Sequence, residues 1–164
     1  MRGWLLALGI VVAFTIQTAI APILSPFGLI PDLILLLVIS IALLKGPVVG
    51  MGIGLVGGLL TDCLAGGIIG VHAMAKMVIG LSCGLMEKTI FKDNFLVPSV
   101  TVWIGTLVHD LIIGLIYSSF GWETMLFNHL WRYTFPLMFY HAILAPFIYY
   151  LVFFTERRLM LRNS

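Results

Sequence analysis

Charged residues are scarce in this sequence, and their scarcity excludes an ordinary soluble protein. Of the 164 residues, 10% are charged and 61% are hydrophobic, whereas soluble domains have about 25% charged and about 45–50% apolar residues. A soluble fold of this length leaves roughly a third of its unfolded-chain surface exposed to water, and so few charged side chains could not cover it. The sequence therefore predicts that hydrocarbon surrounds most of the chain.

The sequence also lacks a strong net charge and closely spaced cysteines. A net charge of +2 with scattered basic residues excludes an extended nucleic-acid-binding surface. The two cysteines, Cys63 and Cys83, are far apart inside apolar runs, which fits neither a CxxC redox pair nor a pair of metal ligands. We expect both to be buried as small apolar side chains, and we expect no cofactor.

Apolar stretches of the length needed to cross a bilayer, about 20 residues, fill the chain. Six candidate spans run over about residues 4–23, 27–44, 48–64, 71–86, 96–117 and 132–154. The connections between them are short, so residues 1–164 are predicted to form a single polytopic membrane domain, an all-α bundle of about six transmembrane helices. Because the third and fourth spans are short and rich in glycine, one of them could be re-entrant, which leaves a five-span layout open.

The placement of lysine and arginine predicts the orientation, because basic loops are retained in the cytoplasm. With six spans and an inner N-terminus, Arg132 lies in an outer loop and Lys76 lies inside a span. The remaining basic residues fall on the inner side: Arg2, Lys45, Lys88, Lys92, Arg157, Arg158 and Arg162. We therefore expect both termini in the cytoplasm. The first apolar run is longer than that of a typical signal peptide, so we expect an uncleaved first helix.

The glycines Gly52, Gly54 and Gly57 have the GxGxxG spacing of a dinucleotide-binding loop. Such a loop needs a preceding strand, a following helix and an acidic residue about 20 residues further on. Here a membrane span surrounds the glycines, and no acidic residue occurs between Asp62 and Glu87. The pattern therefore does not predict a nucleotide site.

The spacing of Gly50, Gly54 and Gly58 predicts helix packing instead. Glycines four residues apart lie on one helix face, and membrane helices associate best where their backbones can approach closely. Gly80 and Gly84 repeat the spacing in the next span. The third and fourth spans are therefore predicted to form a tight hairpin.

Several ionisable residues fall inside the spans, where a charge costs about 2.5–3.5 kcal/mol on insertion scales. Asp62 and Lys76 lie at similar depth near the outer end of the hairpin, with His72 one turn from Lys76. We expect a polar cluster in which Asp62 pairs with Lys76.

His109, Asp110 and His141 lie in the outer halves of the last two spans, and Asp32 begins the second span. These residues could form a polar pocket or proton path that opens outward, or they could hydrogen-bond between helices while Asp32 caps its helix. The histidines lack the close spacing of a zinc helix, and no serine has a flanking acid–base pair. No metal ligand and no catalytic residue is predicted.

The run from Pro31 to Gly80 resembles the core of the rod shape-determining MreD family. In that family a Pro-Asp pair begins an apolar helix, and a glycine-rich stretch that ends in Gly-Leu-x-x-Asp and a Gly-x-x-Ala helix follow. The matching residues here are Pro31 and Asp32, then Gly58, Leu59 and Asp62, then Gly70 and Ala73. Length, hydropathy and the polar Gln17 in the first span also agree.

The resemblance implies a bacterial inner-membrane protein without known catalytic activity, part of the elongasome that directs side-wall peptidoglycan synthesis. It implies a bitopic MreC-type partner and, beyond it, MreB, RodA and a class B penicillin-binding protein. It also implies a bundle like that of the S components of vitamin transporters. The alternative function is therefore a small-solute-binding transporter subunit, and the basic tail Arg157, Arg158 and Arg162 could meet anionic lipid or a partner.

Overall fold

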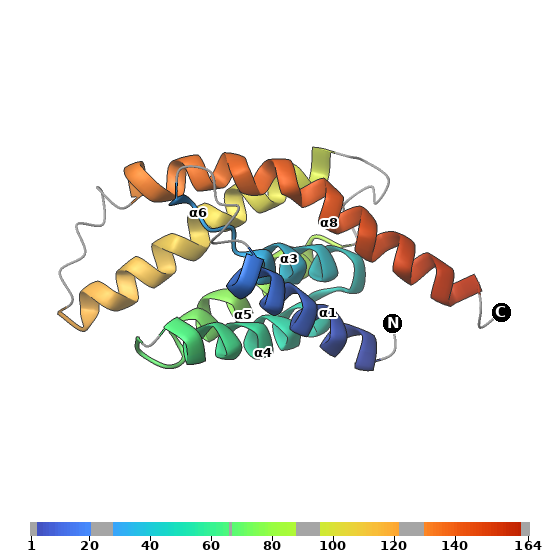
Figure 1. Cartoon of the computed structure of the whole chain (residues 1–164), viewed down its shortest axis with the longest axis horizontal. Helices are drawn as coiled ribbons and strands as arrows, with labels where there is room; N and C mark the ends of the chain where they lie inside the picture. Colours follow the sequence, from blue (N-terminus) through green and yellow to red (C-terminus); the bar gives the residue numbers. More distant parts are fainter. Residues whose placement is uncertain (1–2, 21–27, 66, 88–95, 122–129, 162–164) are drawn as a thin grey trace.

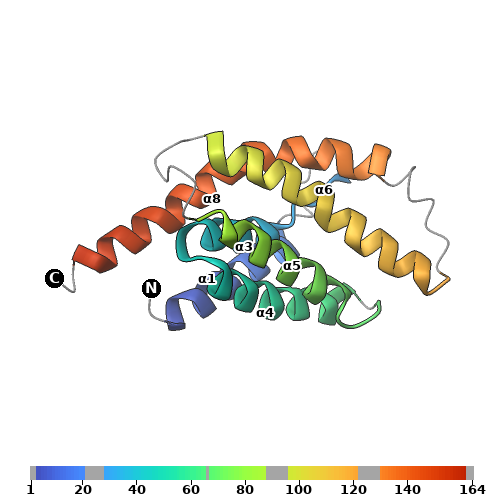
Figure 2. The same ribbon diagram turned by 180° about the vertical axis from the view of Figure 1, so that it is seen from behind.

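The computed structural model of the chain describes residues 3–20, 28–65, 67–87, 96–121 and 130–161. Within these ranges the regular structure is entirely helical (Figures 1 and 2). The helices are α1 (Gly3–Thr15), continued by the π-helical η1 (Ile16–Ile20), α3 (Leu33–Lys45), α4 (Pro47–Ala65), α5 (Val71–Leu85), α6 (Leu96–Ser119), and α8 (Phe135–Leu161), preceded by the π-helical η3 (Leu130–Thr134). The predicted all-α fold is confirmed.

Helix α3 lies at the centre of the bundle, between α1, α4 and α5 on one side and α6 and α8 on the other (Figure 1). Every residue from Ile34 to Leu44 is buried, because α3 is apolar around its whole circumference and neighbouring helices cover all of its faces. The helix ends at Gly46, whose left-handed φ of 87° suits glycine and whose N–H donates to the carbonyl of Ala42.

Helices α4 and α5 form the hairpin that the glycine spacing predicts. A Cβ atom on Gly54 would overlap the backbone carbonyl of Lys76, and one on Gly58 would overlap the backbone of Ala73. At the other end of the hairpin, a Cβ on Gly50 would overlap the carbonyl of Gly80. The two backbones are therefore in direct contact along one face of each helix.

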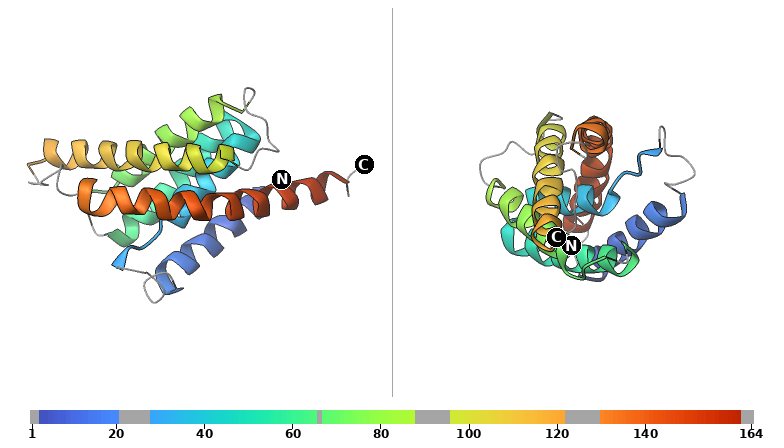
Figure 3. Two further views of the ribbon diagram at one scale, coloured as in Figure 1. Left: turned by 90° about the horizontal axis from the view of Figure 1, so that it is seen from above. Right: turned by 90° about the vertical axis from the view of Figure 1, so that its left-hand side faces the viewer.

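Helices α6 and α8 lie side by side along much of their length (Figure 3). They are the longest helices that the structure describes, with 24 and 27 residues. The rings of Trp103 on α6 and Phe139 on α8 meet edge to face, with their centroids 6.2 Å apart. Together α6 and α8 pack against α3, and they close the bundle on the side opposite the α4–α5 hairpin.

Large apolar side chains cover the outside of the bundle. Along α8 and the turn before it they recur every four residues and are mostly half exposed or more: Trp131, Phe135, Phe139, Ile143, Phe147 and Leu151. We call this row the α8 stripe. Soluble monomers rarely expose contiguous apolar surface of this kind, so the stripe supports a hydrocarbon environment.

The helix lengths differ from the predicted spans. Within the described residues, three helices are long and apolar enough to cross a membrane: Pro47–Ala65, Leu96–Ser119 and Leu130–Arg158. The other three are shorter, and α3 has only 13 residues, which gives about 20 Å of rise against a hydrocarbon core of about 30 Å. It begins at Leu33 because Asp32 caps it there; residues 21–27, where the first span was predicted to end and the second to begin, lie outside the described residues.

The prediction that both cysteines are buried is right for Cys83 and wrong for Cys63, which is exposed. Cys63 lies one turn after Leu59, which is also exposed, so both face outward from α4. An apolar sequence context did not distinguish the two cysteines, because in a membrane protein the outward face is apolar too.

Candidate functional site

A polar network joins four helices at the end of the bundle where α3 begins, and Asp32 is its first member. One Asp32 carboxylate oxygen accepts the N–H of Leu35 at 2.9 Å and thereby caps α3. The other is 2.6 Å from the Nζ of Lys76 on α5. The lysine side chain is completely buried and the aspartate side chain is 16% exposed. The cap that the sequence predicted therefore also serves as the counter-ion of Lys76.

His141 on α8 anchors the same helix end through the backbone. Its Nε2 accepts the N–H of Asp32 at 2.9 Å. Its Nδ1 is 2.9 Å from the hydroxyl of Thr106 on α6, and that hydroxyl also donates to the carbonyl of Val102. The His141 and Thr106 side chains are both fully buried. His141 thus links α3, α6 and α8.

The network continues from Lys76 into α6. The Nε2 atom of His109 is 3.5 Å from the Nζ of Lys76, and its Nδ1 atom is 3.0 Å from a carboxylate oxygen of Asp110. The second oxygen of Asp110 accepts the hydroxyl of Thr134 at 2.7 Å. Each polar side chain in this run therefore has a partner on another helix or a neighbouring residue, as buried polar groups require.

The predicted pairing of Asp62 with Lys76 is wrong. Asp62, at the end of α4, accepts the backbone N–H groups of Gly70, His72 and Ala73 at 2.9–3.1 Å, and its Oδ1 is 3.1 Å from the His72 ring. These N–H groups lie at the start of α5 and have no acceptor within that helix, so they attract an anion. Asp62 therefore caps α5 from the neighbouring helix and leaves Lys76 to Asp32.

The sequence analysis missed Thr106, Thr134, Gln17 as a cap, and the ion pair between Lys45 and Glu156. Gln17 in η1 accepts the N–H of Ile34 at 3.2 Å. The ion pair joins the last residue of α3 to α8 at the opposite end of the bundle. Opposite charges at two span ends on the same predicted side could have indicated that pair. A threonine inside a span gives no comparable signal, because its hydroxyl can bond within its own helix.

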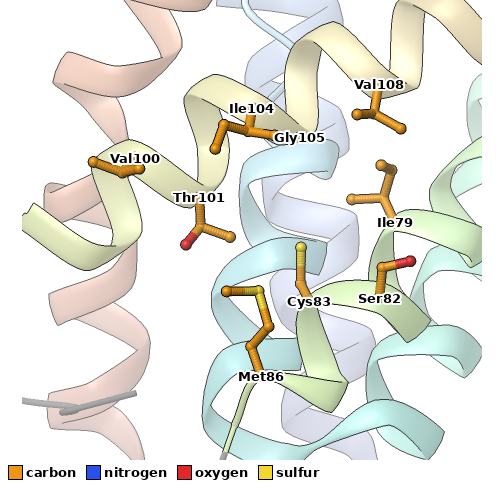
Figure 4. Close-up of a pocket in the computed structure, with 9 residues that line it drawn as sticks. All are labelled: Ile79, Ser82, Cys83, Met86, Val100, Thr101, Ile104, Gly105 and Val108. Carbon is orange, nitrogen blue, oxygen red and sulfur yellow. The ribbon is translucent and has the colours of Figure 1, made fainter. Parts of the chain in front are cut away.

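A cavity of about 290 Å³ lies between α5 and α6 (Figure 4). Its lining is almost entirely apolar, and the side chains of Ile79 and Cys83 face it from α5 while Ile104 faces it from α6. The two helices are therefore less closely packed here than α4 and α5 are.

The other predicted residues are distributed as follows. Gly50, Gly54 and Gly58 lie at the α4–α5 contact. Arg157 and Arg158 are exposed near the end of α8, and Arg162 lies outside the described residues. Among the residues that the structure describes, no group of three or more histidine, cysteine, aspartate or glutamate side chains could hold a metal ion.

The bundle is all-α, with membrane-length apolar helices and an apolar outer surface, and its buried charges are paired between helices. These features define the class of protein: a polytopic integral membrane protein. The family model for the rod shape-determining protein MreD matches residues 2–158. The chain therefore belongs to the MreD family, whose role is in rod shape determination. No curated protein and no solved structure matches it.

Proposed function

We propose that this protein is a non-catalytic scaffold of the elongasome in the bacterial inner membrane, required for rod shape and side-wall peptidoglycan synthesis. Its immediate partner in this proposal is a bitopic protein of the MreC type. MreB, RodA and a class B penicillin-binding protein are the further partners. Membership of the MreD family supports the role in cell shape, and the structure suggests how such a scaffold makes contacts.

One observation carries the proposal: the bundle turns its described polar side chains inward at the Asp32 end and its large apolar side chains outward. The α8 stripe and the outward faces of α4 and α6, with Leu55 and Val100 about half exposed, are surfaces that only lipid or another membrane helix can cover. Within a bilayer, association depends on close packing between such surfaces. A single transmembrane helix of a bitopic protein is suited to this contact.

We propose that both termini lie in the cytoplasm. The exposed Arg157 and Arg158 near the end of α8 support this orientation, since basic segments are retained on that side. There each arginine adds about 1 kcal/mol of attraction to anionic lipid headgroups. The same charges are available to an acidic cytoplasmic partner.

Depletion of the protein from a rod-shaped host tests the cellular role. We expect the cells to become round over a few generations, and re-expression of the intact chain to restore rods. Cells that remain rods after the protein has disappeared from the membrane would contradict the proposal.

A photo-cross-linking amino acid tests the contact surface. We place it singly at Phe147 in the α8 stripe, at Leu55 on α4 and at Val100 on α6, which are all exposed. A specific cross-link to a bitopic protein from one face supports the scaffold proposal and identifies the docking face. Position Ala42, which is fully buried in α3, is the matched control that should give no intermolecular product. If every exposed position cross-links to lipid alone, the result would contradict the proposal of a bitopic partner.

A further inference from the structure

The contact between Lys76 and His109 has a fixed hydrogen-bond direction. A lysine ammonium group can only donate, so the Nε2 atom of His109, 3.5 Å away, must accept. The proton of the neutral ring is then on Nδ1, from which it is donated to Asp110 at 3.0 Å. A neutral His109 in this geometry accepts from α5 on one side and donates to the carboxylate on the other.

A second proton on His109 would reverse this contact. It would add to Nε2, the only ring nitrogen without one, and two cationic donors would then face each other. Asp110 would stabilise the imidazolium, while Lys76 would keep Asp32 as its counter-ion. Protonation thus leaves Lys76 paired with Asp32 and His109 paired with Asp110, and it removes the attraction between Lys76 and His109. We propose that the Lys76–His109 contact is a proton-responsive clasp between α5 and α6.

His141 is not the group that responds. Its Nε2 accepts the backbone N–H of Asp32 and its Nδ1 faces the hydroxyl of Thr106, whose own proton goes to the carbonyl of Val102. Both ring nitrogens are therefore engaged in a neutral arrangement. A second proton would point the Nε2–H of His141 at the backbone N–H of Asp32.

The ionisable groups around His109 come from several helices. Asp32 faces it from α3, Lys76 and His72 from α5, and Asp110 from its own helix. The His72 ring centroid is 6.1 Å away, and that ring bonds to Asp62 of α4. His141 on α8 also lies close enough that a charge on His109 would act on it. The side chains of Asp32 and Asp110 are each 16% exposed.

The seam between α5 and α6 is the contact that can yield when the clasp opens. On its other face α5 is fixed to α4 by backbone contacts at Gly54 and Gly58. Towards α6 it borders the 290 Å³ cavity (Figure 4). Loss of the polar contact therefore separates α6 from α5 rather than α5 from α4, and it exposes Cys83 in the cavity wall.

The rate at which N-ethylmaleimide labels Cys83 tests this motion. The full chain in lipid nanodiscs carries Cys63→Ala, so that Cys83 is the remaining thiol. His109→Gln keeps a polar side chain that cannot take the second proton. Because the thiol reaction itself slows equally in both proteins at lower pH, the ratio of their labelling rates isolates the clasp.

We expect a ratio of wild-type to His109→Gln labelling near one where the His109 ring is neutral and roughly ten where it carries its second proton, the change that about 1.4 kcal/mol of weakened contact produces. His72→Gln, the matched control, should keep the wild-type response. A ratio that stays near one in both protonation states of His109 would overturn the proposal.

Nitrogen-15 spectra of the histidine rings give a second test. The signal that disappears in His109→Gln should, in the wild-type protein, show a neutral ring with its proton on Nδ1, and on acidification it should report the pH at which the ring takes its second proton. The Cys83 labelling ratio should rise over the same pH range. A neutral His109 ring with its proton on Nε2, or a labelling ratio that does not follow this signal, would contradict the clasp.

Discussion

Helix α5 is held in different ways on its two sides. Towards α4, glycines bring the backbones into direct contact at Gly54 and Gly58. Towards α6, a polar contact at Lys76 and His109 lies beside an apolar cavity. Since lipid is as apolar as the helix surfaces, helices in a membrane gain stability from close packing and from hydrogen bonds between them. This bundle uses the first on one side of α5 and the second on the other.

The largest expected effect is on the glycine side. Gly54→Val would drive its side chain into the backbone carbonyl of Lys76, which cannot move without separating α4 from α5. Overpacking typically costs about 1–3 kcal/mol; because the clash here is with backbone, we expect a loss of folding free energy well above that range and little folded protein in the membrane. The matched control is Gly52→Val, because a Cβ at Gly52 meets nothing within 4 Å. Equal amounts of folded protein from the two variants, measured by size-exclusion chromatography in detergent, would contradict the backbone contact.

The next effect is on the polar side. Lys76→Met leaves the Asp32 carboxylate without its cation, and loss of one member of a buried ion pair costs about 3–5 kcal/mol. Asp32→Asn in the same chain removes the stranded charge, so the double variant should be more stable than Lys76→Met alone. Unfolding in mixed detergent and dodecyl sulfate measures the coupling.

Asp62→Asn sharpens this result, because Asp62 bonds to the first turn of α5 and not to Lys76. Its effect should add to that of Lys76→Met with no coupling. Coupling between Asp62 and Lys76 as large as that between Asp32 and Lys76 would contradict the assignment of the ion pair.

The smallest expected effect comes from one hydroxyl group. Thr134→Val removes the donor to Asp110 but keeps the side-chain shape, and we expect the free energy of unfolding to fall by about 1 kcal/mol. Thr101→Val is the control, because the Thr101 hydroxyl bonds to the carbonyl of Val97 in its own helix. The same unfolding assay should rank Thr134→Val below Thr101→Val in stability, and the reverse order would weaken the case for the network.

Sequence spacing predicted the parts of the fold that depend on one helix or on adjacent helices. The four-residue period of Gly50, Gly54 and Gly58 identified a packing face, and Pro31–Asp32 identified a helix start. Both features depend on the position of a residue along its own helix, which sequence specifies directly. The all-α class followed from the scarcity of charge.

The partner of Lys76 could not be predicted in the same way. Sequence gives the depth of a side chain in the membrane, and Asp32, Asp62 and Lys76 share a depth. It does not give the order of helices around the bundle, which decides that α3 lies against α5. The hydroxyls of Thr106 and Thr134 were missed for the same reason, since only the assembled bundle shows that they reach other helices.

The wide sequence separation of the groups that meet at Asp32 sets an order on biosynthesis. The backbone N–H of Asp32 bonds to His141, 109 positions later in the chain, and a ribosome adding about 5–20 residues per second needs roughly 5–20 seconds to supply it. Until α8 enters the bilayer, the Asp32 N–H at the start of α3 lacks this acceptor. Completion of the polar network is therefore an indication that α8 has been inserted, and a chain truncated before α8 should be a preferred substrate for membrane quality control.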